Sequence, residues 1–151
     1  MHGHINSSKA ELVLLLQINY VVMQTFEIQL IVTQDDLDSL NHVNNVRYVQ
    51  WVQDVAEQHW NENATDQILS EYFWVLLDHH ISYKNPAILG DVITLRTYIK
   101  SSGGVTCVRV VEIIDLNTDK LLASSETKWC LVSQKNMKPA RITEEIRILF
   151  S

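Results

Sequence analysis

The residues best suited to chemistry lie in one short polar segment, DDLDSLNHVNNVRY at positions 35–48. It places three aspartates, one histidine and three asparagines directly before a stretch with helical periodicity. A carboxylate or an imidazole can act as a base, and a carboxylate can also act as a nucleophile. The free backbone N–H groups at the start of a helix can hold a negative charge that develops on a carbonyl oxygen. The segment therefore combines side chains that can act as a base or nucleophile with a helix start that can stabilise an anion.

Aspartate and asparagine before a helix also have a purely structural use. Their side chains cap the first turn by accepting hydrogen bonds from backbone N–H groups, and Asn44 or Asn45 is well placed to do so here. Asp35 and Asp36 are expected to lie in a solvated loop. Spacing alone therefore leaves catalysis and capping open for this segment.

The helix that follows the polar segment is expected at residues 46–61. Apolar residues recur at helical spacing on one broad face, and polar residues occupy the opposite face. We expect the apolar face to be buried, and Asp54 and Glu57 on the polar face to meet solvent. The apolar face is formed by Tyr48, Val49, Trp51, Val52, Val55, Ala56, His59 and Trp60.

Five segments have the composition or alternation of β-strands. One precedes the polar segment and four follow the helix. The turns at 101–104 and 115–120 join the last three strands as hairpins, and consecutive hairpins require antiparallel pairing. The strands are expected at 26–33, 72–85, 90–100, 105–115 and 121–133.

One long helix with a broad apolar face needs a sheet to cover it. The order of elements therefore predicts an α+β fold, with one antiparallel five-stranded sheet wrapped around one long central helix. This domain is expected to span residues 26–151, after an N-terminal extension at 1–25. The apolar run at 12–23 is shorter than the ~20 residues that cross a bilayer and lacks a cleavage pattern. We expect an extra docked element there, or an alternative start of the chain at Met23.

Two neighbouring histidines lie within the expected strand at 72–85. His79 and His80 point to opposite faces of a strand, so they cannot both serve one site. We expect His79 to be a core histidine with its hydrogen bonds satisfied. Its face is expected to carry Phe73, Val75, Leu77, Ile81 and Tyr83 as well.

Composition excludes several classes of function. The formal net charge of −6 argues against a nucleic-acid binder, which usually presents a basic face. No Cys or His cluster has metal-ligand spacing, and neither a phosphate-binding glycine loop nor a Ser or Cys nucleophile motif occurs. Cys107 and Cys130 lie in apolar strands and are expected to be reduced core residues. We therefore expect a cytoplasmic protein without metal or cofactor.

Two motifs together resemble the hotdog-fold acyl thioesterases, most closely the 4-hydroxybenzoyl-CoA thioesterase family. DLDSLNHVNNVRYVQW at 36–51 is similar to the family's aspartate followed by His-Val-Asn-Asn-x-x-Tyr. ISYKNPAILGDVI at 81–93 is similar to its Tyr-x-x-Pro-x-x-x-Gly-Asp segment. The resemblance runs from about Phe26 to the C-terminus.

The resemblance implies a role for each residue of the polar segment. Asp38 would be the general base or nucleophile, and backbone N–H groups near Asn45 and Val46 would form the oxyanion hole. His42 and Asn45 would complete the catalytic set by orienting the loop, the water or the thioester. Residues expected to bind substrate are Asn44, Val46, Tyr48, Arg47 and Lys84, with Lys100 and Lys128 as further candidates for the CoA 3′-phosphate.

The resemblance also implies a substrate and an assembly. We expect hydrolysis of an acyl-CoA thioester by a homodimer or homotetramer that pairs strand edges, with sites at the subunit boundary and without nucleic acid or a membrane span. A non-catalytic module that binds acyl thioesters, an acyl-ACP thioesterase and a hotdog dehydratase or hydratase are the alternatives.

The chain departs from two branches of these enzymes. Plant-type acyl-ACP thioesterases share His-Val-Asn-Asn but have asparagine where this chain has Leu40, and Glu-Cys where it has Pro86 and Ala87. Another branch has a histidine where this chain has Asn45. The aspartate is kept while its helpers differ, which argues against an acyl-ACP substrate.

Overall fold

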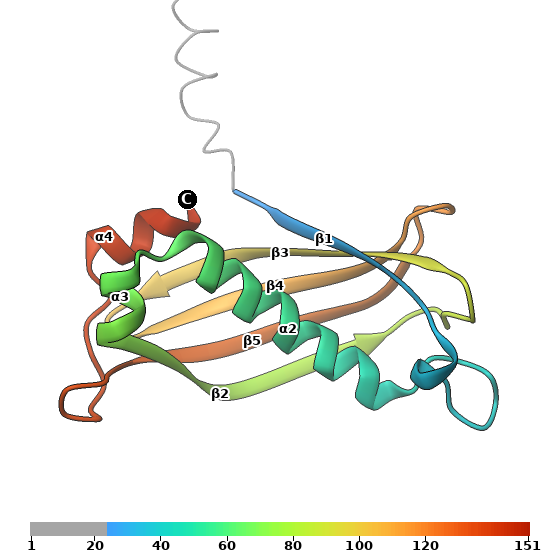
Figure 1. The fold of residues 1–151 in the computed structure, drawn as a ribbon, viewed down its shortest axis with the longest axis horizontal. Coiled ribbons are helices and arrows are strands. Elements are labelled where there is room, and N and C mark those ends of the chain that lie inside the picture. The colour runs from blue at the N-terminus through green and yellow to red at the C-terminus, as the bar shows by residue number, and fades with distance from the viewer. Residues whose placement is uncertain (1–23) are drawn as a thin grey trace, which may run out of the picture.

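The computed structural model describes residues 24–151 as one antiparallel sheet with one long helix across its face (Figure 1). The strands lie side by side in the order β1-β3-β4-β5-β2, and every neighbouring pair is antiparallel. This confirms the expected α+β architecture. The strands are β1 (Phe26–Ile31), β2 (Tyr72–Tyr83), β3 (Val92–Gly103), β4 (Thr106–Asp115) and β5 (Leu121–Ser133).

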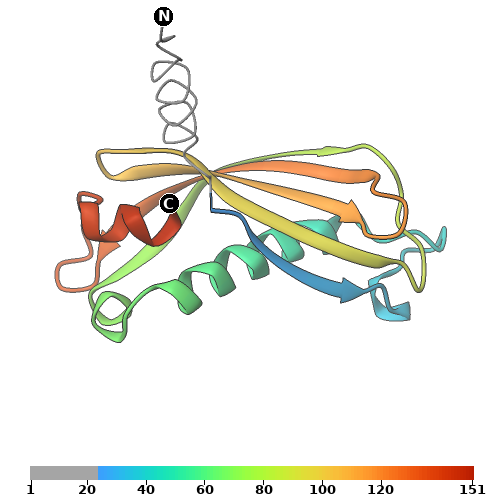
Figure 2. The same ribbon diagram turned by 90° about the horizontal axis from the view of Figure 1, so that it is seen from above.

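The long helix, α2 (Asn45–Asn63), lies along the face around which the sheet bends (Figure 2). Its buried residues are those of the expected apolar face except Val49, which is half-buried, whereas Asp54 and Glu57 are exposed as expected. Burial of this face holds the sheet and the helix together. The other helical segments are short: η1 (Gln34–Asp36), α3 (Asp66–Glu71), α4 (Glu144–Arg147) and η2 (Ile148–Phe150).

The N-terminal segment of the sequence is only partly described. The apolar run at 12–23 and Met23 itself lie outside the described residues, so the proposed extension at 1–25 stays a prediction. Within residues 24–151, no helix is both long enough and apolar enough to cross a membrane. Cys107 and Cys130 are both buried and unlinked, as expected for reduced core residues.

Strand β2 differs from its expected phase because of an irregularity near its centre. Its pairing with β5 shifts by one residue there, as a β-bulge does. Trp74 and His79 therefore lie on the same face, towards α2, although five positions separate them. The sequence expectation was wrong for the first half of the strand, since it had placed Phe73, Val75 and Leu77 on the His79 face.

The expected solvated loop contains one buried carboxylate. Asp36 is only 9% exposed. Its Oδ2 accepts hydrogen bonds from the backbone N–H of Thr33 at 2.8 Å and from the Thr33 hydroxyl at 3.1 Å, and its Oδ1 lies 2.9 Å from Nε of Arg47. Asp36 thus ties the end of β1 to the start of α2. The expectation was wrong for Asp36, whereas Asp35 is exposed as expected.

We expect Asp36→Ala to lower the free energy of unfolding by about 1–3 kcal/mol, because it removes the acceptor of Thr33 and the partner of Arg47. Urea denaturation measures this change. Asp35→Ala is the matched control, and its effect should stay within about 0.5 kcal/mol because its side chain is exposed. Equal destabilisation by the two variants would contradict the structural role of Asp36.

Candidate active site

The predicted catalytic loop closes on itself around Asp38. Oδ1 of Asp38 accepts the backbone N–H groups of Leu40 at 2.8 Å and of His42 at 3.2 Å. The Asp38 N–H donates to the carbonyl of His42 at 2.8 Å. Asn41 adopts the left-handed region, with φ of 60°, which asparagine tolerates better than most residues. Oδ2 of Asp38 has no hydrogen-bond partner within residues 24–151, and it remains available for a water or a carbonyl carbon.

The start of α2 is capped by Asn44, one of the two expected caps. The Asn44 side chain accepts the N–H of Val46 at 3.0 Å, and its carbonyl accepts the N–H of Arg47 at 2.8 Å. The Val46 N–H is therefore occupied. In the described part of the chain, the Asn45 N–H is the first-turn donor that remains without a partner.

The second sequence motif lies directly against this helix start. Tyr48 is 3% exposed, and its hydroxyl accepts the N–H of Ala87 at 3.2 Å. The Ala87 carbonyl in turn accepts the N–H of Val43 at 2.9 Å, and the Tyr83 hydroxyl donates to the Asn45 carbonyl at 3.2 Å. Burial raises the pKa of the Tyr48 hydroxyl, which therefore stays protonated. Tyr48 supports the loop from beneath, and a direct contact with substrate stays a prediction.

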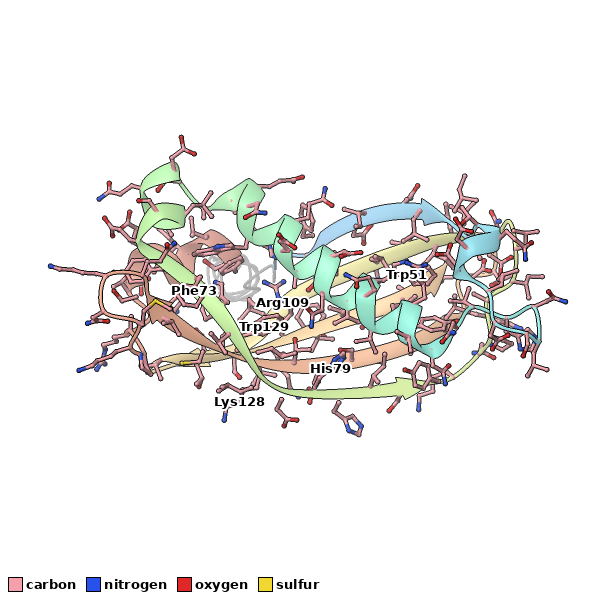
Figure 3. The ribbon with its side chains drawn as sticks, turned by 60° about the horizontal axis from the view of Figure 1, so that its bottom comes forward. Trp51, Phe73, His79, Arg109, Lys128 and Trp129 are labelled. Atoms are coloured by element: carbon pink, nitrogen blue, oxygen red, sulfur yellow. The ribbon has the colours of Figure 1, made fainter. Side chains whose placement is uncertain are left out.

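The candidate cations differ in their availability. Arg47 is held by Asp36 and by the carbonyl of Asp35, and Lys100 forms an ion pair with Glu126. Lys84 and Lys128 are exposed and form no ion pair within residues 24–151. Lys84 directly follows β2 beside the helix start, whereas Lys128 points away from α2 on the outer face of β5 (Figure 3).

A cavity of about 450 Å³ lies between the second half of α2 and the sheet. None of the residues predicted to be catalytic or to bind the CoA carrier lines it. Along α2 the cavity extends from Gln53 to Asn61, so its near edge lies about 12 Å from Asn45 at ~1.5 Å per residue. Within one chain, the loop therefore lies at the start of α2, and the cavity lies along its second half. The large aromatic residues that line the cavity include Trp60, Tyr72, Trp74, Trp129 and Phe150.

Arg109 on β4 lines this cavity and is only 5% exposed (Figure 3). Its Nη1 donates to Nδ1 of His59 and to Oγ1 of Thr97, both at 2.9 Å. The guanidinium carbon lies 5.5 Å from the centre of the Phe150 ring. Burial lowers the pKa of Arg109 to about 10, so the side chain is still a cation at neutral pH. It forms no ion pair with any residue in 24–151.

Two histidines near α2 are neutral for the same physical reason. Burial, and then the charge of Arg109, lower the pKa of His59 to about 4, so its Nδ1 can accept from Arg109. Burial also lowers the pKa of His79, whose Nε2 lies 2.9 Å from the hydroxyl oxygen of Ser125. His79 is half-buried and has one of the hydrogen bonds that the sequence predicted, at Nε2, and His80 is exposed on the other face.

Arg109 was missed by the sequence analysis, although the sequence carries a signal for it. Residues Cys107, Val111 and Ile113 share its face of β4 and are apolar and buried. A single cation on an otherwise apolar strand face is the pattern that marks such a residue. In the described residues, no group of His, Cys, Asp and Glu side chains could hold a metal ion.

The comparison with known families gives an extended match. Residues 19–150 match the model of the acyl-ACP thioesterase N-terminal domain. A curated relative, oleoyl-acyl carrier protein thioesterase 2 from Arabidopsis thaliana, is 31% identical over 75 residues, which are 49% of this chain. The match spans only 20% of that relative's length. Membership of the 4-hydroxybenzoyl-CoA thioesterase branch stays a prediction.

Solved structures share the architecture at low sequence identity. A 1,4-dihydroxy-2-naphthoyl-CoA thioesterase from Synechocystis is 18% identical, with a TM-score of 0.73 over 84% of this chain and 96% of its own. A hypothetical protein from Staphylococcus aureus, solved in complex with CoA, is 19% identical, with a TM-score of 0.75 over 87% of this chain and 84% of its own. These likenesses confirm the hotdog fold.

We expect His59 to make the protein less stable in acid. The unfolded chain takes up a proton on this histidine near pH 6.5, whereas the folded chain resists protonation down to about pH 4. The free energy of unfolding should therefore fall by roughly 3 kcal/mol as the pH drops between these two values, and the loss should level off below them. Urea denaturation at a series of pH values measures the slope.

His59→Gln keeps an acceptor for Arg109 but removes the titration, so it should flatten this slope. His80→Gln is the control, because His80 is exposed and should leave the slope unchanged. An unaltered slope in His59→Gln would refute the assignment.

Proposed function

Because residues 19–150 make the chain a member of the acyl-ACP thioesterase family, we propose that it hydrolyses an acyl thioester at the Asp38 loop. The observation that carries this proposal is the geometry of Asp38. Oδ1 is used to hold the loop, while Oδ2 is without a partner among residues 24–151, directly before a helix start with one unused N–H. A carboxylate and a candidate oxyanion donor thus belong to the same short segment that leads into α2, which supports the proposal.

In the proposed reaction, Asp38 acts as general base or as nucleophile. As a base, it takes a proton from water while the water oxygen bonds to the thioester carbon. The carbonyl oxygen becomes an oxyanion, which the Asn45 N–H and the positive end of the α2 dipole stabilise. The C–S bond then breaks, and the thiolate leaves and takes up a proton. As a nucleophile, Asp38 would bond to the thioester carbon, the C–S bond would break with departure of the thiolate, and water would then hydrolyse the resulting anhydride.

The neighbouring residues have supporting roles in this proposal. Asn44 holds the first turn of α2 and so aims the Asn45 N–H. His42 is exposed beside Asp38, where its ring can orient the water. The exposed side chain of Val46 would contact the acyl or pantetheine chain. Tyr48 would hold the loop in position through its hydrogen bond with the Ala87 N–H.

We propose that a second copy of the chain completes the site. Strand β2 is an edge of the described sheet, and Val75 and Leu77 on it are 39% and 54% exposed. One end of β2 contacts the helix start through Tyr83, and the other end lines the aromatic cavity through Tyr72. Antiparallel pairing of two β2 edges would therefore set the Asp38 loop of each subunit beside the cavity of its partner.

The first candidate for the carrier of the acyl group is CoA. Lys84 supports it, because this exposed cation stands beside the helix start and forms no ion pair within residues 24–151, so it can meet a phosphate. The second candidate is acyl carrier protein, which the family match favours. A non-catalytic binding module is the remaining alternative. Hydrolysis of any acyl thioester by the protein excludes this alternative, and a lack of hydrolysis supports it.

We expect Asp38→Asn to lower kcat by about 10²–10⁴, the range found for loss of a general base. Folding should be little changed, because the amide oxygen can still accept the N–H groups of Leu40 and His42. The measurement is hydrolysis of the same acyl chain presented on CoA and on acyl carrier protein. Asp54→Asn, on the exposed face of α2, is the matched control. A variant that keeps more than about a tenth of the wild-type rate would remove Asp38 from the mechanism.

We expect a homodimer at micromolar concentration, measured by light scattering. Leu77→Asp should yield monomers, because pairing two β2 strands about their centres would bring the two new carboxylates together. Hydrolysis should fall in parallel, since each loop would lose its partner's cavity. Leu116→Asp changes an exposed leucine in the turn after β4 and should leave the dimer intact. A wild-type protein that is monomeric and fully active would overturn the shared site.

A further inference from the structure

The aromatic cavity contains a charge that its own walls do not balance. Arg109 is a buried cation, and its neighbours in hydrogen bonding, His59 and Thr97, are both neutral. Removing a guanidinium from water is unfavourable unless an anion or a full set of hydrogen bonds replaces the water. The described residues supply neither, so the cavity needs a partner that is not part of them.

The free donors of Arg109 have a defined geometry. A guanidinium carries five N–H bonds, and its Nη1 uses both of its own on His59 and Thr97. The Nε and Nη2 atoms make no hydrogen bond to residues 24–151, and together they form the edge that binds a carboxylate through two parallel bonds. Neither nitrogen is fully enclosed, since Oγ1 of Thr94 is the one fully enclosed side-chain atom without a partner in residues 24–151, so both keep some accessible surface on the cavity that Arg109 lines.

The other titratable residues of the cavity wall leave this charge in place. Burial raises the pKa of the Cys107 thiol to about 11, so it is neutral at physiological pH. Glu57 lines the cavity from the exposed side of α2, where water solvates its carboxylate, and it forms no ion pair with Arg109. The buried part of the cavity wall is therefore largely aromatic, and the guanidinium of Arg109 is the charged group in it.

We propose that this cavity receives an acyl group whose far end is a carboxylate, and that Arg109 binds that carboxylate through Nε and Nη2. The substrate class is then an ω-carboxyacyl thioester, the half thioester of a dicarboxylic acid. The proposal rests on the proposed hydrolysis, and it adds the chemical identity of the acyl group. Arg109 is a specificity-determining residue here, distant from the bond that breaks.

The walls suit such a chain along its whole length. Trp60, Trp74 and Trp129 offer apolar faces to methylene groups, and Arg109 offers the matching charge at the inner end. His59 and Thr97 hold Nη1 in place, so the guanidinium fork is oriented before the ligand arrives. A neutral chain end would leave the fork unpaired, and the site therefore discriminates against it.

The first experiment measures binding without catalysis. Tryptophan fluorescence reports the cavity, since three tryptophans line it. Straight-chain monocarboxylates are compared with primary amides of the same length, and we expect the carboxylates to bind at least about tenfold more tightly. Equal binding of the two series by the wild-type protein would overturn the anion site.

The second experiment measures hydrolysis of ω-carboxyacyl-CoA esters of increasing length against their ω-methyl esters. At the length that reaches Arg109, the free carboxylate should raise kcat/KM by at least about tenfold. Arg109→Met should abolish this preference and Arg109→Lys should keep part of it. Arg96→Met, which replaces a half-buried arginine on β3 that does not line the cavity, should keep the preference in full.

The outcomes separate the two proposals. Hydrolysis of thioesters at every length with no preference for the carboxylate overturns the role of Arg109 and leaves thioester hydrolysis standing. Selective carboxylate binding that is lost in Arg109→Met, without hydrolysis of any acyl thioester, upholds the anion site and overturns the proposed function. If Arg109→Met does not fold, the paired ligands on the wild-type protein and on Arg109→Lys still give the answer.

Discussion

The whole structure depends on the burial of one broad apolar face of α2. A single helix of this length can be covered only by a sheet that bends along it, and the five antiparallel strands do so. Because the sheet covers one face of the helix, the start of the helix and its second half have different surroundings. The polar loop must lie where the helix begins, and the aromatic cavity lies between the second half of the helix and the sheet. The Asp38 loop and the Arg109 cavity are thus both positioned by this helix.

Capping and catalysis are compatible uses of the loop before α2. Asn44 caps the helix, and Asp36 joins the loop to Arg47 inside the protein. Asp38 divides its two oxygens, with Oδ1 holding the backbone and Oδ2 unbonded to residues 24–151. A loop fixed by its own hydrogen bonds can hold a reactive carboxylate in one orientation without ordering cost at the moment of reaction. The segment is rich in polar residues because it must both cap the helix and hold the reactive carboxylate.

Periodicity and turn residues in the sequence were sufficient to predict the architecture. The face of α2 and the antiparallel order of the strands follow from local patterns, because an amphipathic segment can bury only one side. Three features could not be obtained in this way. The bulge in β2 changes phase without a marker in the sequence, and the burial of Asp36 depends on Arg47 from another element. The cavity around Arg109 arises only when four strands and α2 meet. Long-range geometry therefore decided what local patterns left open.

The bulge in β2 has a consequence for how this domain can change over evolutionary time. The residues before it, with Trp74, shape the cavity, and the residues after it, up to Tyr83, support the start of α2. Because the shift in pairing lies between the two halves, substitutions in one half need not alter the alternation of the other. A lineage can thus remodel the pocket wall while the reactive loop keeps its support. One inserted residue makes a single strand behave as two independently variable modules.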